Sequence, residues 1–417
     1  MAADVGTDII DIADLDVPDL GADIAQLDHV AAAARHRELA DEHWIVRGTF
    51  GHAVLRYDDV TAILRDKRWH NVVAKIPEML GITDPEVLSR PPSILAAEGD
   101  VHVRLRRLVS KAFSPRSADR LRPFMREVMD ELVDAVADAG RADVSTDICE
   151  PYPIPIICEL LGAPREDWRS FSRWAEDVLR IFNGTALAEL DVIDQAQREL
   201  NDYVAELIAA RRHDPRDDLI TDLIAAEEEG DRLSTPELVS MVNAVIVGGT
   251  DTTRNQLACA LSVFAAHPDQ WAMLADRPEL AATAVEECMR YFGAVRATGR
   301  FASEDIVHRG VRFPAGSMVF PSLVAANGDD GVIAGATDRF DITREPVRGR
   351  PHMTFGSGIH YCLGASLARA ELQEALPILA RRMPELAVDG RIEWKPQGTA
   401  IFGPAHFPVT FTPAGVA

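Results

Sequence analysis

Cysteine is scarce in this chain of 417 residues, and signatures of disulfide or zinc sites are missing. The five cysteines are an odd number, scattered between Cys149 and Cys362, so they do not suggest a disulfide framework. None of them forms a Cys-x-x-Cys pair of the kind that holds structural zinc. Scattered thiols favour a reducing compartment, and we expect a cytoplasmic protein.

Long apolar runs and excess positive charge are missing as well. No apolar run approaches 18 residues, so we expect no transmembrane helix. Residues 1–28 are acidic and contain no basic segment followed by an apolar one, as a secretion signal would. The 43 Lys and Arg face 66 Asp and Glu, which gives a formal net charge of −23. This charge argues against nonspecific binding to nucleic acid or to an anionic membrane surface.

No linker rich in Gly, Ser or Pro divides the chain, so we expect one domain over residues 21–417 after a loose acidic segment at 1–20. Apolar periodicity predicts a mainly α-helical protein. A short hairpin is predicted at 44–47 and 53–56, and strands between 392 and 411. The predicted helices cover residues 22–42, 58–66, 101–113, 118–139, 154–161, 166–182, 187–212, 217–229, 234–266, 280–292 and 363–376.

The segment Phe355–Gly364 is the most informative part of the chain, and it reads Phe-Gly-Ser-Gly-Ile-His-Tyr-Cys-Leu-Gly. Cys362 follows a glycine-containing loop and precedes a predicted helix, whose N-terminus favours a thiolate. Such a thiolate is a metal ligand or a nucleophile. A single thiolate without protein co-ligands fits haem iron, because the porphyrin supplies four ligands. An isolated cysteine is more often a small buried hydrophobic residue. The role of Cys362 is therefore assigned from the residues around it.

A second signal lies in the middle of the long predicted helix 234–266. Ser234 and Glu237 form a capping box at its start. Its centre reads Gly-Gly-Thr-Asp-Thr-Thr over residues 248–253. Each of two adjacent glycines destabilises a helix by about 1 kcal/mol relative to alanine. Such glycines indicate that another group approaches the helix backbone closely or that the helix is kinked. A buried aspartate beside hydroxyl groups is either paired with a neighbour or used in chemistry.

Both patterns resemble motifs of the cytochrome P450 family of haem-thiolate monooxygenases. The resemblance runs from about residue 44 to the end and implies a mainly helical fold with a long central helix and a small β-rich lobe. It implies haem b as cofactor, with Cys362 as axial thiolate and Phe355 and Gly356 beside it, and with His360 on a haem propionate. In the helix motif, Asp251 relays protons, Thr252 places a hydroxyl next to the oxygen molecule, and Gly248 leaves room for oxygen and water.

Further residues match the family one by one. His102, Arg106 and Arg300 lie where the family holds haem propionates, with His102 in place of a common Trp, and His352 is a weaker candidate. Glu287, Arg290 and Arg344 match a structural Glu-x-x-Arg group and its later Arg partner. The chain departs from the family in lacking a Pro after the Glu-x-x-Arg helix and an Arg in the Ala-Asn-Arg-Asp segment.

Alignment with the family also implies an apolar pocket for a lipophilic small molecule. Arg296 is its polar exception if the side chain points inward, and an outward direction is equally open. Terpenoids, steroids, fatty acids, macrolides and aromatic acids all remain open as substrates. The residues expected to line the pocket are Ala244, Val247, Gly248, Val295, Ala297 and Ile401.

The resemblance implies that electrons come from NAD(P)H through a reductase and a ferredoxin. Between Val101 and Ala118 the chain has five basic residues and no acidic one. This run is either a solvated helix face or a docking surface for an acidic ferredoxin. Two rivals to the monooxygenase remain: a peroxide-driven or oxidative-coupling haem enzyme, and a haem-binding protein without turnover. The five basic residues are Arg104, Arg106, Arg107, Lys111 and Arg116.

Overall fold

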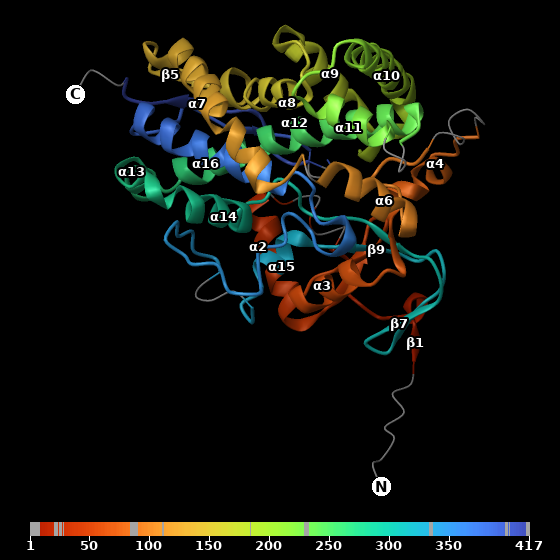
Figure 1. The fold of residues 1–417 in the computed structure, drawn as a ribbon. Helices are drawn as coiled ribbons and strands as arrows, with labels where there is room; N and C mark the ends of the chain where they lie inside the picture. Colours follow the sequence, from red (N-terminus) through yellow and green to blue (C-terminus); the bar gives the residue numbers. More distant parts are fainter. Residues whose placement is uncertain are drawn as a thin grey trace.

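The computed structural model describes residues 9–20, 24, 27, 29–83, 91–110, 112–183, 185–228, 233–332, 337–396, 399 and 401–413. Helices dominate the described part (Figure 1), as the sequence predicted. They are α2 (His29–Glu42), α3 (Tyr57–Arg65), α4 (Ile76–Met79), α6 (Gly99–Ser110), α7 (Pro115–Ala137), α8 (Pro153–Leu161), α9 (Trp168–Leu179), α10 (Leu190–His213), α11 (Leu219–Glu228), α12 (Thr235–Ala265), α13 (Pro268–Asp276), α14 (Ala281–Tyr291), α15 (Leu323–Asn327) and α16 (Ala365–Arg382).

The helix α12 runs through the middle of the helical part (Figure 1). It contacts α8, α9 and α10 on one side and α13, α14 and α16 on the other. The predicted capping box is present: Ser234 Oγ accepts from the backbone N–H of Glu237, and the Glu237 carboxylate accepts from that of Ser234. These bonds satisfy donors that a helix N-terminus leaves unpaired. The sequence therefore predicted the start of α12 correctly.

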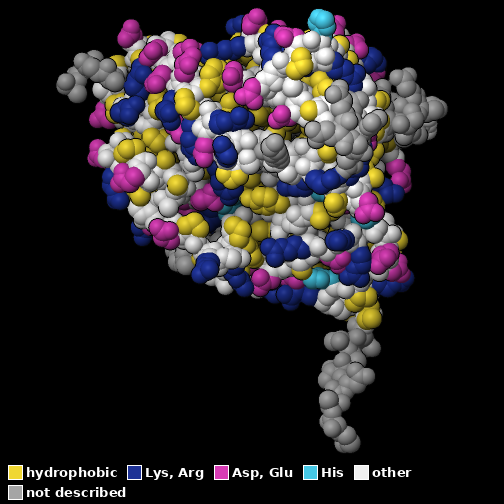
Figure 2. Space-filling view, in the orientation of Figure 1, with side chains coloured by type: hydrophobic (Ala, Val, Ile, Leu, Met, Phe, Trp, Pro, Cys, Tyr) yellow, Lys and Arg dark blue, Asp and Glu magenta, His cyan; other side chains and the backbone are white. Residues whose placement is uncertain are grey.

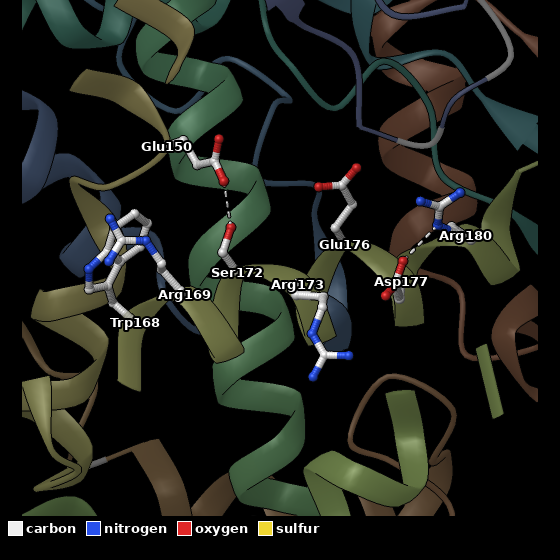
Figure 3. A pocket seen from close by; sticks show the side chains of 8 residues that line it. All are labelled: Glu150, Trp168, Arg169, Ser172, Arg173, Glu176, Asp177 and Arg180. Atoms are coloured by element: carbon white, nitrogen blue, oxygen red, sulfur yellow. Dashed lines mark hydrogen bonds and ion pairs between the residues drawn. The ribbon is translucent and has the colours of Figure 1, made fainter. Parts of the chain in front are cut away.

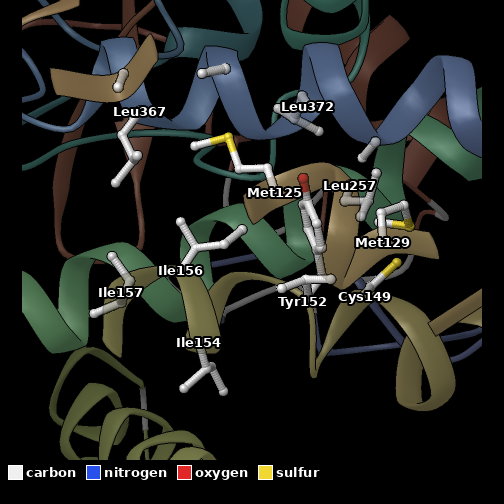
Figure 4. Packing of buried hydrophobic residues seen from close by; sticks show 14 of the residues in the cluster. Met125, Met129, Cys149, Tyr152, Ile154, Ile156, Ile157, Leu257, Leu367 and Leu372 are labelled. Carbon is white, nitrogen blue, oxygen red and sulfur yellow. The ribbon is translucent and has the colours of Figure 1, made fainter. Parts of the chain in front are cut away.

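A large apolar core surrounds α12 and fixes its position. Figure 4 shows part of it, where Met125 and Met129 of α7 and Tyr152 lie between α12 and α16. The hydroxyl of the fully buried Tyr152 donates to the carbonyl oxygen of Glu371, 2.9 Å away, which satisfies its polar end. This packing holds α12 and α16 in a fixed relation, and both helices carry residues of the predicted site.

The sheets β2-β3-β9-β6-β4 and β1-β8-β7 form a smaller β-rich lobe, whereas β5 lies beside α7 in the helical part and pairs with β13 (Figure 1). The main sheet of the lobe has the order β2-β3-β9-β6-β4, in which β3 and β9 run parallel. The predicted hairpin is present as β2 and β3, and the predicted C-terminal strands as β11 to β13. The strands are β1 (Ile10–Asp11), β2 (Ile45–Gly48), β3 (Gly51–Val54), β4 (Trp69–Asn71), β5 (Arg141–Asp143), β6 (Arg300–Ala302), β7 (Ile306–His308), β8 (Val311–Phe313), β9 (Met318–Pro321), β10 (Ala387–Val388), β11 (Glu393–Trp394), β12 (Pro404–His406) and β13 (Pro408–Thr410).

The N-terminal part of the chain differs from two of the predictions. Residues 9–20 are not loose, because Ile10 and Asp11 pair with Val311 and Arg312 of β8 and Asp19 forms a bridge with Arg47; residues 1–8 lie outside the described part. The predicted helix 22–42 is described from His29 onward, as α2. In the described part of the chain, no helix combines the length and apolar character that crossing a bilayer requires.

A buried ion-pair group joins α14 to the segment around residue 340. Arg290 donates to Glu287 at 2.7 Å, and Arg344 Nε reaches Glu287 Oε1 at 3.2 Å. Arg290 also donates to the carbonyl oxygens of Asn327 and Thr337. The three residues assigned structural roles are therefore in mutual contact, and each buried charge has several partners, as a low-dielectric interior requires.

The two central glycines of α12 lie in different surroundings. A Cβ on Gly249 would collide with the end of the Ile157 side chain of α8, whereas a Cβ on Gly248 would meet no atom within 4 Å. We expect Gly249→Ala to lower the free energy of unfolding by about 1–3 kcal/mol through overpacking. Gly248→Ala should raise it by up to about 1 kcal/mol through helix propensity.

Denaturant titration of both variants checks this pair, and each serves as the control for the other. Equal changes in the free energy of unfolding of the two variants would show that packing against α8 does not distinguish Gly249 from Gly248.

Candidate functional site

The cysteine loop is a tight turn supported by glycines. The backbone N–H of Cys362 donates to the carbonyl oxygen of Phe355 at 2.9 Å, which closes the loop. Gly356 and Gly358 have positive φ of 69° and 74°, a region that disfavours other residues. A Cβ on Gly358 would collide with the backbone of Leu64 in α3, whereas Gly356 and Gly364 border open space. The loop therefore presents a bare backbone surface around the cysteine.

The surroundings of the free Cys362 thiol act on its pKa in opposite directions. Burial raises its pKa above the ordinary value, and a hydrogen bond from the Gly364 N–H and the charges of Arg106 and Arg369 only partly oppose this. The sequence places Cys362 directly at a helix N-terminus, whereas in the structure it lies three residues before α16 begins at Ala365 and is partly buried. A metal ion would displace the proton, since the ligating form of cysteine is the thiolate.

A polar network lies behind the loop. Arg369 of α16 pairs with Glu286 at 2.5 Å and donates to the Tyr361 hydroxyl at 3.1 Å. Its guanidinium also covers the ring of Phe355 at 4.5 Å. His352 Nε2 lies 3.3 Å from Glu286. The structure thus places His352 in this network and not with the residues proposed for the propionates.

Those residues form a buried basic cluster, consisting of His102 and Arg106 of α6, Arg300 of β6, and His360. The rings of His102 and His360 lie 4.5 Å apart, and Arg106 donates to the carbonyl oxygen of Ile359 at 3.2 Å. Burial lowers the pKa of His102 to about 4 and that of Arg300 to about 10. The structure thus brings together four side chains that come from three distant parts of the sequence.

Glu98 is a member of this cluster that the sequence reasoning missed. Its carboxylate accepts from His360 Nε2 at 3.0 Å and from the Asn71 N–H of β4 at 2.6 Å. Burial alone would raise its pKa, but these hydrogen bonds and the charge of His360 leave it below the ordinary value. The one local feature of the sequence at Glu98 is the glycine that directly follows it. Gly99 is the first residue of α6 and has a φ of 55°.

The cluster fits the two carboxylates of a haem. Arg300 is 3% exposed, yet the hydrogen bonds of its guanidinium go to neutral oxygens, those of Thr298 and Gly299. A buried cation is costly without an anion nearby, and Glu98 is a single carboxylate among several basic groups. The adjoining loop offers one cysteine, and no group of three or more His, Cys, Asp or Glu in the described part is arranged to hold a metal ion. One sulfur beside a basic cluster suits haem.

One face of α12 is less buried than the rest of the helix. Ala244, Val247 and Thr252 are only partly buried and Gly248 is exposed, whereas most of their neighbours on the helix are buried. Their spacing places all four on one side of the helix. The Thr252 hydroxyl donates to the carbonyl oxygen of Gly248 at 2.7 Å. The residues predicted for oxygen and substrate therefore share one surface.

Asp251 follows Ala244 by seven residues and so falls on the same side of α12 by spacing, but the residue is buried, with 5% of its surface exposed. Arg254 Nε donates to Asp251 Oδ1 at 2.6 Å, Asn255 Nδ2 donates at 3.1 Å, and Lys395 Nζ lies 3.7 Å away. The sequence reasoning did not anticipate these partners. Arg254 is detectable as a basic residue one turn after an acid, but Lys395 has no local signal.

Glu371 of α16 is a further buried carboxyl group that the sequence did not single out. It is 1% exposed, and neither of its side-chain oxygens has a partner within hydrogen-bond distance. Burial raises its pKa to about 8, and the nearby Thr253 hydroxyl only partly offsets this. Burial thus favours the protonated form of this carboxyl group, which lies near Thr253, the residue that follows Thr252.

The remaining residues predicted for the pocket lie on two neighbouring backbone segments. Val295 forms a β-bridge with Ile401, and Ala297 with Ser322. The guanidinium of Arg296 lies 5.0 Å from the centre of the buried Phe402 ring. Neighbouring residues of an extended segment point to opposite sides, so Arg296 lies away from the side that Val295 faces.

Known proteins resemble this chain over most of its length. The sequence profile described as Cytochrome P450 matches residues 45–277 and 269–383. The chain is 37% identical over 394 residues to the mycinamicin IV hydroxylase/epoxidase of Micromonospora griseorubida, covering 91% of this chain and 95% of that protein. It is 35% identical over 366 residues to the vitamin D(3) 25-hydroxylase of Pseudonocardia autotrophica, covering 86% and 87%. The crystal structure of CalO2 superposes with a TM-score of 0.84 at 31% identity, covering 94% of this chain and all of that one.

Glu98 offers a test of the basic cluster. We expect Glu98→Gln to slow haem loss about fivefold, because the amide keeps an acceptor for His360 and Asn71 and removes a negative charge near the propionates, worth about 1 kcal/mol. Haem transfer to an excess of apomyoglobin, followed by absorption, measures the rate.

Asp100→Asn removes the same charge from an exposed position two residues away and should leave the rate unchanged. Faster haem loss from Glu98→Gln than from the unchanged protein would contradict repulsion between the Glu98 carboxylate and the propionates. It would show that the carboxylate holds the loop with His360 in place.

Proposed function

Because this chain belongs to the cytochrome P450 family and is a haem monooxygenase, we propose that Cys362 is the thiolate that binds the haem iron and that the open face of α12 receives O₂ and substrate. The observation that carries the proposal is the convergence of the cysteine loop and the buried basic cluster, next to the core that holds α12 and α16 together. Arg106, Arg300 and His360 neutralise the haem propionates in this proposal, and His102 packs against His360.

The bound haem supplies the oxidising chemistry, in which O₂, two electrons and two protons yield one oxygen atom for the substrate and one water. The protein residues supply position and protons. Phe355 shields the cysteine from one side, and Arg369, which covers the Phe355 ring, holds it there. Thr252 holds a hydroxyl at the open face, and Asp251 delivers protons from solvent.

The proposed substrate is an apolar small molecule. Ala244, Val247 and Gly248 give the open face of α12 an apolar character, and Val295 and Ile401 lie together at a β-bridge. The two relatives described above are named for mycinamicin IV and vitamin D₃, so lipophilic compounds of this kind are the first to test. Loss of iron-bound water on binding, seen as a shift of the haem absorption, identifies a ligand.

We also propose that electrons come from NAD(P)H through a reductase and a ferredoxin. Arg107 and Arg116 are exposed near α6 and the start of α7 and would contact an acidic donor. Arg104 pairs with Glu237 of α12 at 2.9 Å, which gives it a structural partner instead. Lys111 lies outside the described residues. All five cysteines are free thiols, which supports a cytoplasmic location.

Replacing Cys362 tests the central assignment. We expect Cys362→Ser to lose the absorption of the reduced carbon monoxide complex near 450 nm that marks a thiolate ligand, because an alcohol is a much weaker donor to iron. Cys288→Ser, which changes a buried cysteine of α14, is the control and should keep the absorption. An unaltered spectrum in Cys362→Ser would remove the basis of the proposal.

Replacing Thr252 separates a monooxygenase from a peroxide-driven enzyme and from a haem protein without turnover. We expect Thr252→Ala to lower the product formed per NAD(P)H on the order of tenfold, with peroxide released instead, because proton delivery is no longer directed. The neighbouring Thr253→Ala is the control. Product and peroxide yields that equal those of the unchanged protein would favour one of the two rivals.

A further inference from the structure

Arg369 carries a positive charge that the proposed function does not use. It lies on α16 and binds Glu286 of α14 with two nitrogens, Nε at 2.5 Å and Nη2 at 3.1 Å. Its third nitrogen, Nη1, donates to the hydroxyl of Tyr361 at 3.1 Å. Because every nitrogen of the guanidinium has a partner, its charge is held in one place.

This charge lies against both ends of the loop that carries Cys362. The Arg369 guanidinium is 4.5 Å from the centre of the Phe355 ring, and the carbonyl oxygen of Phe355 accepts from the N–H of Cys362 at 2.9 Å. Tyr361, to which Arg369 also donates, directly precedes Cys362 in the chain. The fold thus holds a cation beside the residue that is proposed to bind iron.

Solvent screens this ion pair less than it screens charges on the open surface. Figure 2 shows Lys, Arg, Asp and Glu side chains spread over one face of the molecule, where water and salt weaken their fields. The side chains of Arg369 and Glu286 are only 25% and 22% exposed. Burial would raise the pKa of Glu286, but its neighbours His352 and Arg369 lower it to about 2. Both members of the pair are therefore charged at neutral pH.

We propose that Arg369 and Glu286 together set the reduction potential of the bound haem. The inference rests on the proposed binding of iron by Cys362 and adds how the protein controls the uptake of the first electron. Reduction transfers one electron from the donor to the iron, so the site gains one negative charge. Arg369 favours the ferrous form because it supplies positive charge beside the axial ligand, and Glu286 limits this effect by neutralising part of that charge.

Opposite effects of the two residues separate a charge effect from a loss of structure. Replacing either residue weakens the same contacts between α14 and α16, so a structural role predicts potential shifts of the same sign. The charge that remains differs, because one variant keeps the arginine without a carboxylate and the other keeps the carboxylate without an arginine. An electrostatic role therefore predicts shifts of opposite sign.

The experiment measures the ferric–ferrous reduction potential of the haem-loaded protein without substrate, by following its absorption during titration with dithionite and redox dyes. We expect Glu286→Gln to shift the equilibrium about threefold toward ferrous iron and Arg369→Gln about tenfold toward ferric iron. A tenfold shift corresponds to about 59 mV for one electron. Arg369→Lys keeps the charge and should stay within about twofold of the unchanged protein.

Asp177→Asn of α9 is the matched control. Asp177 is also a partly buried carboxylate in an ion pair with an arginine, since its side chain is 16% exposed and lies 2.9 Å from Arg180. Figure 3 shows this pair at a surface cavity along α9. The variant changes the net charge by the same amount as Glu286→Gln but at another place in the fold, and it should leave the potential unchanged.

Equal potentials in all variants, or shifts of the same sign in Glu286→Gln and Arg369→Gln, would overturn the inference. If Arg369→Gln does not retain haem, the Glu286→Gln shift decides alone: a shift toward ferrous iron supports the inference, and any other result overturns it. The carbon monoxide spectrum distinguishes this failure from a failure of the proposed function. Only in the latter case does the unchanged protein lack the absorption of a thiolate ligand.

Discussion

Buried positive charge is the constraint on which the cofactor site depends. Arg106 and Arg300 are the cationic groups of the cluster, since burial lowers the pKa of His102 to about 4, and Glu98 is the carboxylate that the protein provides beside His360. Burial works against these charges, as the lowered pKa values of Arg106 and Arg300 show. Buried cations are costly without anions nearby, and in the proposed function the propionates of a haem supply these anions.

The second constraint is the helix α12, whose sides serve different purposes. Gly249 packs tightly against α8, Gly248 and Thr252 border open space, and Asp251 and Arg254 face the polar contacts of α9. Because successive residues of a helix point about 100° apart, five neighbouring positions can meet three environments. This short motif thus borders an open surface at Gly248 and Thr252 and carries a buried ion pair at Asp251.

Much of the site was predictable because it is local in sequence. The cysteine loop, the central motif of α12 and the Glu287–Arg290 pair each lie within ten residues, so their spacing alone indicates a common place. The long-range partners were not predictable in this way. Glu98, Lys395 and the position of His352 depend on how α6, β11 and α16 pack together. The raised pKa of Cys362 was missed for the same reason, since burial is a property of the folded chain and not of the loop.

The sequence by itself determined the family, the helical class of the fold, the boundaries of α12 with its capping box, and the cysteine that binds iron in the proposed function. These rest on local hydrogen bonds, apolar periodicity and dense motifs, all of which act between near neighbours. Only the tertiary structure decided which charges meet. The partners of Asp251 and the anion in the basic cluster come from segments up to about 260 residues apart. Electrostatic interactions depend on distance in space and on burial, and neither can be read from the order of the residues.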